Sequence, residues 1–182
     1  MNDLLILALL LQGPKHGYAL KKEATLLFGQ QDMHNNLVYP LLRRFVNQRW
    51  VTRKKVAGDR GQTRQVYALT PLGRQAIVHR VRDFGVPEAS SAEHFAIRVG
   101  LFEILSTDGR LAILDTRKAF LLQRAAHFAP ISESLVMGAY PRQVVNFLAK
   151  SIDRELAWIE KLRRIVNTSA PRTFANQRSG HS

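Results

Sequence analysis

Residues 35–70 of this 182-residue chain are NNLVYPLLRRFVNQRWVTRKKVAGDRGQTRQVYALT. The first third of the stretch has the apolar spacing of an amphipathic helix, with Leu37, Leu41, Leu42 and Phe45 on one face. Two strand-like segments follow, joined by a loop around GDRG at 58–61. A helix followed by a two-stranded wing is typical of a winged helix-turn-helix domain, whose helix can enter the major groove of DNA.

Predicted helices flank this stretch on both sides. Two precede it, over residues 4–12 and 16–28, and one follows from a Thr70 cap with Pro71 at its first position. The expected fold is mainly α with a small two-stranded β wing: an N-terminal winged helix-turn-helix plus a C-terminal helical dimerisation domain. The predicted organisation is a DNA-binding domain over 1–84, a linker over 85–91, a helical dimerisation or effector domain over 92–167 and a flexible tail over 168–182.

The charge of the chain predicts a polyanionic partner. The net charge is +13 and the pI is near 10.9. Up to Gly85 there are 14 Lys and Arg against 5 acidic residues, giving +9, and the remainder has 13 against 9, giving +4. The excess therefore lies mainly in the predicted DNA-binding half, as expected for a protein that contacts phosphates.

Other classes of function lack support in the sequence. The chain has no cysteine, which excludes disulfides, Cys zinc sites and thiol chemistry. Its six histidines are scattered and it has no catalytic motif, so we expect neither an enzyme nor a bound cofactor or metal. The apolar run at 4–11 is far shorter than the roughly 20 residues of a membrane span. We therefore expect a cytoplasmic protein without membrane association.

The last predicted helix has a seven-residue apolar rhythm that only Glu155 interrupts. Steps of three and four residues form a helix-packing seam. The seam indicates either packing on the preceding helices of the same chain or a homodimer interface. Helix-turn-helix proteins commonly bind two half-sites as symmetric dimers, which favours the interface. The candidate interface residues are Val145, Leu148, Ile152, Leu156, Ile159 and Leu162.

Three short motifs at these separations resemble the PadR family of winged helix-turn-helix transcriptional regulators over residues 4–77. They are HGYALK at 16–21, VYPLLRR at 38–44 and YALTPLG at 67–73. The resemblance implies a homodimeric, repressor-like protein that responds to a small aromatic or amphipathic effector. Where the family often has Lys-Tyr-Tyr in the strand after the wing, this chain has Gln65-Val66-Tyr67, so one basic contact is missing.

Candidate DNA contacts lie at three places in the predicted domain. At the start of the second helix, backbone N–H groups attract phosphate, although His16 can equally serve as a cap. In the third helix, Asn35 and Asn36 suit adenine edges or cap the helix, and Tyr39 can contact phosphate or pack on the second helix. The wing tip can contact phosphate or the minor groove, or it can be a solvated turn. The full set is Lys15, His16, Gly17, Tyr18, Asn35, Asn36, Tyr39, Arg43, Arg44, Arg60, Gln62, Thr63 and Arg64.

The arginines late in the third helix and the basic residues of the first wing strand have less specific expected roles. Arg43 and Arg44 come late in the third helix, so we interpret them as phosphate clamps rather than base contacts, or simply as surface arginines. Residues 53–55 (RKK) are expected to contribute long-range field rather than specific contacts.

The second half is rich in aromatic residues. Phe95 and Phe102 share a helix face, and an aromatic stripe is most often core. The other interpretation is an apolar effector pocket, with Trp158 as one wall.

The resulting hypothesis is a homodimeric regulator that binds double-stranded DNA at a near-palindromic operator. The alternative, from another class of function, is a basic winged-helix protein that binds RNA or associates with the ribosome. The two differ in preferred nucleic acid and in the need for two-fold symmetry.

Overall fold

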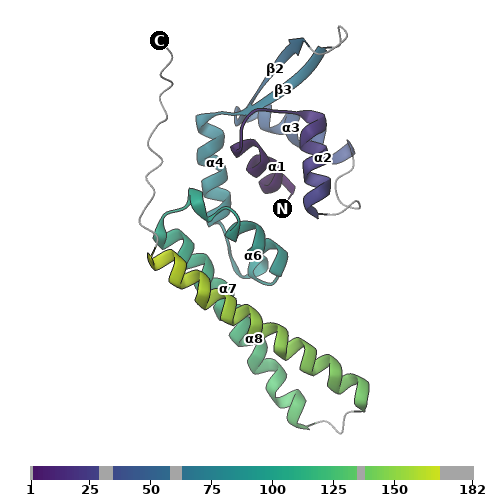
Figure 1. Cartoon of the computed structure of the whole chain (residues 1–182), viewed down its shortest axis with the longest axis vertical. Coiled ribbons are helices and arrows are strands. Elements are labelled where there is room, and N and C mark those ends of the chain that lie inside the picture. The colour runs from purple at the N-terminus through teal and green to yellow at the C-terminus, as the bar shows by residue number, and fades with distance from the viewer. Residues whose placement is uncertain (1, 29–34, 58–62, 135–137, 169–182) are drawn as a thin grey trace. The chain divides into compact units, whose positions relative to one another are not determined.

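The computed structural model describes residues 2–28, 35–57, 63–134 and 138–168 (Figure 1). The chain divides into two compact units, Met1–Asp83 and Phe84–Ser182. The fold is mostly helical with a small antiparallel sheet, as predicted. In the N-terminal unit the elements are α1 (Asn2–Leu11), β1 (Lys15–His16), α2 (Gly17–Phe28), α3 (Asn35–Asn47), β2 (Val51–Ala57), β3 (Thr63–Leu69) and α4 (Pro71–Arg82).

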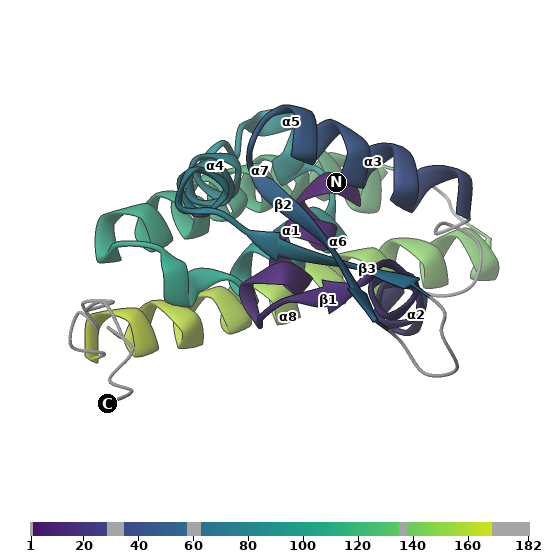
Figure 2. The same cartoon turned by 90° about the horizontal axis from the view of Figure 1, so that it is seen from above.

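The wing is confirmed, and the sheet has one strand more than the sequence predicted. The strand order is β1-β3-β2, with β3 antiparallel to both neighbours (Figure 2). The added strand β1 has only two residues, too short for a detectable alternating pattern. It pairs Lys15 with Tyr67 and His16 with Val66, which ties the start of α2 to the wing.

A buried apolar cluster holds the helices of this unit together. The run at 4–11 lies in α1, and α1 contacts α2, β3 and α4. Val38, Leu42 and Phe45 are the buried face of α3. Ile77 and Val81 supply the buried side of α4. The predicted apolar face of α3 is confirmed at Leu42 and Phe45, whereas Leu37 and Leu41 are only half-buried and the buried Val38 was not predicted.

The junction between β3 and α4 explains the glycine of the third motif. The Thr70 side chain caps α4 by accepting a hydrogen bond from the Gly73 amide at 2.9 Å, and Pro71 opens the helix as predicted. The Thr70 hydroxyl also donates to the carbonyl oxygen of Trp50 at 3.0 Å. A Cβ on Gly73 would lie 2.1 Å from that same oxygen, so only glycine fits here.

Pro40 is an unusual residue for the interior of α3. Proline is best tolerated in the first turn of a helix, so Pro40 by itself would suit a helix that begins at Asn36 or Leu37. The structure begins α3 at Asn35 and places Pro40 inside the helix. The Pro40 ring is exposed, so it avoids a clash with the core, but the helix loses one backbone hydrogen bond there.

The described secondary-structure elements of the C-terminal unit are all helices. The predicted linker at 85–91 contains a helical turn, and its Ala89 is fully buried. Its Gly and Pro suggested a linker, yet Pro87 also suits the first turn of a helix. Helices α7 and α8 run side by side (Figure 1). The elements are α5 (Val86–Ala89), α6 (Ala92–Val99), the 3-10 helix η2 (Phe102–Ile104), α7 (Thr107–Ser134) and α8 (Ala139–Thr168). The tail was predicted to begin at Thr168, but Thr168 is the last residue of α8, and residues 169–182 lie outside the described residues.

Candidate nucleic-acid interface

Several of the predicted DNA contacts converge on one recess of about 590 Å³ in the N-terminal unit. The recess joins three elements, namely the start of α2, the first turns of α3 and the strand β3. Its lining includes five of the predicted residues and two that the sequence analysis did not select, Ala19 and Gln65. The predicted members are His16, Gly17, Tyr18, Tyr39 and Arg64.

The recess is open to a ligand from solvent. Tyr18 is 72% exposed and Tyr39 is 40% exposed, which is unusual for large aromatic side chains. The N-terminus of α2 lies at the recess, so its free N–H groups and helix dipole favour a negative charge there. The Nδ1 atom of His16 is buried and has no hydrogen-bond partner among the described residues. Such a surface suits a phosphate flanked by apolar sugar.

A second recess, of about 640 Å³, lies along α4. Successive turns of that one helix line it, and it brings together none of the predicted site residues. Volume alone therefore does not locate the site.

Lys15 lies beside the recess with its charge already paired. Its Nζ atom is 2.8 Å from the Glu23 carboxylate, one of the few acidic groups of the unit, and its side chain is 17% exposed. A phosphate contact by Lys15 would have to compete with this ion pair.

The structure separates the two arginines of α3. Arg43 is four residues after Tyr39, so the two side chains leave the helix on the same side, and both are exposed. Arg44 leaves on the opposite flank, where its Nη2 atom is 3.5 Å from the Asp3 carboxylate. Arg43 therefore fits the predicted phosphate contact, whereas Arg44 has an intrachain role that the sequence analysis did not foresee.

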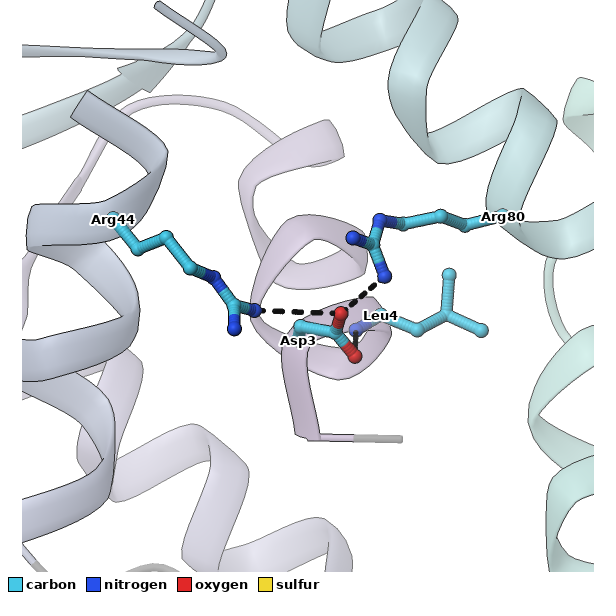
Figure 3. Close-up of polar contacts among 4 residues, drawn as sticks. All are labelled: Asp3, Leu4, Arg44 and Arg80. Carbon is cyan, nitrogen blue, oxygen red and sulfur yellow. Dashed lines mark hydrogen bonds and ion pairs between the residues drawn. The ribbon is translucent and has the colours of Figure 1, made fainter. Parts of the chain in front are cut away.

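Asp3 connects three helices of the N-terminal unit (Figure 3). Its carboxylate caps α1 by accepting from the Leu4 amide at 2.9 Å, and it pairs with Arg80 of α4 and Arg44 of α3. The Arg80 guanidinium also lies 5.0 Å from the Trp50 ring centroid. Burial alone would raise the pKa of the Asp3 carboxyl, but Arg80 and the Leu4 amide outweigh it and hold the pKa below its usual value.

Arg53 and Gln65 of the wing strands form a polar cluster with Tyr67 that the sequence did not predict. Arg53 stands opposite Tyr67 in the register of β2 and β3, and it acts on the Tyr67 phenol electrostatically. The Tyr67 hydroxyl donates to Gln65 Oε1 at 3.0 Å. Residues at i and i+2 share a face of a strand, so the alternation of 53 with 55 and of 65 with 67 could have revealed this cluster.

Four predicted contacts have side chains outside the described residues. Asn35 and Asn36 open α3 in backbone only, and Arg60 and Gln62 of the wing tip are not described. Thr63 begins β3 and is exposed.

The candidate effector residues lie in the aromatic core of the C-terminal unit. Phe95 is fully buried and Phe102 is 9% exposed, as the core interpretation predicts. They do not share one helix face as expected, because α6 ends at Val99 and Phe102 lies in η2. Trp158 packs edge-on against Phe95, with ring centroids 5.5 Å apart, and keeps an exposed edge. These contacts favour core packing for Phe95 and Phe102 and leave only Trp158 accessible.

The seam on α8 has two faces with different roles. Ile152 and Ile159 are buried within the chain, since α8 packs on α7, so they are not available to a second chain. The other four candidate interface residues are half-buried. A second apolar line is exposed on α8, in steps of three, four, seven and eleven residues that keep it on one side of the helix. It consists of Tyr140, Val144, Phe147, Trp158 and Ile165.

Glu155 interrupts the apolar rhythm because it pairs with a buried arginine of α7. The Arg117 Nε and Nη2 atoms lie 2.7 Å from the two Glu155 carboxylate oxygens, a bidentate pair. Arg117 Nη1 donates to the Ala89 carbonyl, and its guanidinium lies over the Phe95 and Phe120 rings. The arginine is 2% exposed. Nothing in a single helix pattern announces a partner on another helix.

Other functional classes gain no support from the described part of the chain. Over those residues no group of three or more His, Asp or Glu is placed to hold a metal ion. No described helix is long and apolar enough to cross a membrane.

Residues 6–79 match the model of the transcriptional regulator PadR-like family. Among solved structures, Bacillus subtilis PadR in complex with operator DNA is 18% identical, covering 90% of this chain and 98% of that chain with a TM-score of 0.43. The same protein in complex with p-coumaric acid is 19% identical, covering 91% and 98% with a TM-score of 0.39. The protein TA0346 from Thermoplasma acidophilum is 28% identical, covering 43% and 74% with a TM-score of 0.40. None of the curated proteins compared matches the chain.

Proposed function

Since residues 6–79 carry the domain of the PadR-like family, a family of transcriptional regulators and not of enzymes, we propose that this chain is a sequence-specific DNA-binding regulator. It acts in the cytoplasm as a homodimer and represses transcription until a small aromatic or amphipathic effector releases it. The observation that carries the proposal is the recess in which the start of α2, the outward face of α3 and the wing strand meet. The net charge of +13 supports a nucleic-acid partner.

The recess suggests how DNA is bound. In a winged helix-turn-helix the third helix enters the major groove. Here that helix carries Tyr39 and Arg43 on its exposed side. The N-terminus of α2 then faces the phosphate backbone of the DNA, and Arg64 on β3 approaches the same DNA strand from the wing. Phosphate contacts fix the register of the protein, and the side chains of α3 supply sequence discrimination.

Dimerisation is supported by the exposed line of apolar side chains on α8. Phe147 is 64% exposed and Tyr140 is 87% exposed, and both lie on one side of the helix with Val144. A contiguous apolar strip of this kind commonly marks a protein interface. A second copy of the chain would present the same strip, so a two-fold axis beside α8 would cover both. The interface residues are then those of the exposed line, flanked by the half-buried Val145, Leu148, Leu156 and Leu162.

An effector can release DNA only by binding one dimer geometry better than the other. The exposed edge of Trp158 lies on the proposed interface line and also contacts the aromatic core through Phe95. A planar apolar effector that stacks on this edge would act on the spacing of the two DNA-binding units. The sequence resemblance to effector-responsive regulators supports such a ligand.

The test is fluorescence anisotropy with DNA from upstream of the protein's own gene, against a scrambled duplex and a duplex RNA, over a salt series. We expect tight binding to the upstream DNA at two protomers per site, with a steep loss of affinity as salt rises. A duplex selected from a random pool by the protein replaces the upstream DNA if that promoter is not its target. A preference for RNA would favour the ribosome-associated alternative, and equal binding to all three polymers would refute sequence specificity.

A further inference from the structure

Two tyrosine rings from different elements meet at Gly17, the first residue of α2. A Cβ on Gly17 would lie 3.0 Å from Cε1 of Tyr39 and 3.4 Å from Cε2 of Tyr67. The first distance is shorter than ordinary carbon contacts of 3.5 to 4.0 Å, so a larger residue would push the Tyr39 ring aside by a few tenths of an ångström. Glycine at this position therefore lets the Tyr39 ring approach α2 more closely than any other residue would.

Tyr67 extends this contact into the wing. Its side chain is only 5% exposed, and its hydroxyl donates to Gln65 Oε1 at 3.0 Å. Burial raises the pKa of the Tyr67 phenol, although Arg53 acts in the opposite direction, so the hydroxyl keeps its proton and remains a donor. Gln65 in turn lines the same recess as Tyr39. The buried Tyr67 ring thus lies against Gly17 beside the Tyr39 ring. Through its hydroxyl, Tyr67 also holds Gln65 at the edge of the recess.

We propose that Tyr67 and Gly17 are positioning residues that fix Tyr39 of α3 and Gln65 of the wing strand relative to each other, and thereby set how well the protein distinguishes its operator from other DNA. The inference rests on the proposed function and names the part of that surface on which discrimination depends. Neither residue needs to touch DNA, because Gly17 acts through a shape and Tyr67 through a hydrogen bond and a ring contact.

The physical reason is preorganisation. Non-specific affinity comes from the number of phosphates that Lys and Arg neutralise, and it is insensitive to small shifts of a side chain. Specific affinity depends on contacts made at fixed positions, and a surface that must be ordered on binding loses part of its interaction energy. A displaced Tyr39 would therefore weaken operator binding more than binding to other DNA.

The first experiment compares Gly17→Ala with Gly85→Ala as a matched control. A Cβ on Gly85 would meet its nearest atoms at 3.6 Å, an ordinary contact in the other unit. For Gly17→Ala we expect affinity for a duplex selected by the wild-type protein to fall about tenfold, close to the cost of one mismatched base pair, with affinity for scrambled DNA within about twofold. Gly85→Ala should behave as the wild type on both duplexes.

A second variant guards against misfolding of the first. Tyr67→Phe keeps the ring on Gly17 but removes the hydrogen bond to Gln65. We expect a loss of about threefold to fivefold on the selected duplex alone, the range of one neutral hydrogen bond.

A direct readout of position uses fluorine NMR, since the chain has only four tyrosines. In protein labelled with 3-fluorotyrosine, Gly17→Ala should shift the signals of Tyr39 and Tyr67 and leave that of Tyr140 unchanged. An unmoved Tyr39 signal, or equal losses on both duplexes, would overturn the inference while the proposed function stands. If the wild-type protein binds no selected duplex more tightly than scrambled DNA, the proposed function itself is refuted, and the role of Tyr67 and Gly17 in discrimination is refuted with it.

Discussion

The two units of this chain dispose of their apolar side chains in different ways. In the N-terminal unit the buried faces of α1, α3 and α4 account for most of the large apolar residues, and apart from Tyr18 and Tyr39 of the recess the exposed ones are scattered singly. In the C-terminal unit, α8 carries one buried apolar line against α7 and a second line that is exposed. Scattered apolar residues need no explanation, whereas exposed apolar side chains aligned on one side of a helix indicate a partner that covers them.

Their ion pairs differ in the same sense. Asp3 joins α1, α3 and α4 at the edge of the first unit, and its arginine partners are 48% and 37% exposed. Arg117 and Glu155 join α7 to α8 inside the second unit, where the arginine side chain is 3% exposed. The ion pairs of Asp3 can be broken at a small cost in stability, because water can solvate the exposed arginines. The Arg117–Glu155 pair cannot be broken so cheaply, so it fixes how α7 and α8 align.

The largest effect is expected from Glu155→Ala, which leaves the Arg117 charge buried without its partner. We expect a loss of about 3 kcal/mol in the free energy of unfolding, the lower part of the range for broken buried pairs. The matched control is Glu160→Ala, since Glu160 pairs with the neighbouring Lys118 at 2.6 Å with both side chains well exposed. It should cost less than about 1 kcal/mol. Urea unfolding of both variants measures the difference in the free energy of unfolding. Equal losses for the two variants would contradict the distinction between the buried Arg117–Glu155 pair and the exposed Lys118–Glu160 pair.

The next effect is on assembly and tests the exposed line of α8. Phe147→Asp places a charge in the proposed interface twice per dimer, so we expect the dimer affinity to fall at least about 100-fold, equivalent to about 2.7 kcal/mol. Analytical ultracentrifugation should show monomers with unchanged helical content. Asn146→Asp adds the same charge one position away and serves as the control. A Phe147→Asp variant that remains dimeric would move the interface elsewhere.

A third comparison separates the two arginines of α3. Arg43→Ala should weaken binding to a selected duplex about fivefold to tenfold and reduce the salt dependence by about one counterion, as expected for a lost phosphate contact. Arg44→Ala should change DNA affinity less, because its side chain lies toward Asp3. Anisotropy titrations over a salt series decide the matter. If Arg44→Ala had the larger effect on DNA, the assignment of the two flanks of α3 would be wrong.

The smallest effect concerns Asp3 and its dependence on pH. The lowered pKa of Asp3 means that its stabilising contribution is present above its unfolded value of 3.8 and is lost as pH falls through the lower folded value. Asp3→Asn should cost about 1 kcal/mol at neutral pH, since the arginine partners are partly exposed. Its stability should then fall less than that of the wild type between about pH 4 and pH 2. Thermal melts of the wild type and Asp3→Asn over this pH range measure the difference, with Asp153→Asn as the control. Melting temperatures of the wild type and Asp3→Asn that fall in parallel would mean that Asp3 does not contribute to the pH dependence of stability.

Local patterns were sufficient to predict much of the N-terminal unit. The apolar spacing of α3, the Thr70 cap with Pro71 and the two wing strands each depend on residues a few positions apart. Side chains three or four apart on a helix, or two apart on a strand, share a face whatever surrounds them. The family resemblance over 4–77 likewise rests on short motifs, and the match over 6–79 confirms it.

What the sequence could not decide were the partners of residues far apart in the chain. The amino-acid order placed Arg43 and Arg44 together, yet only the fold brought Asp3 to Arg44. Glu155 stood out as an interruption, but its meaning required Arg117 on another helix. Gly17 was part of a motif, and only packing showed that two tyrosine rings lie against the position that its side chain would occupy. The sequence determined which face each element would bury, because that depends on local geometry. The tertiary structure decided which charged and aromatic groups meet, because a pairing across the core depends on the packing of every element between them.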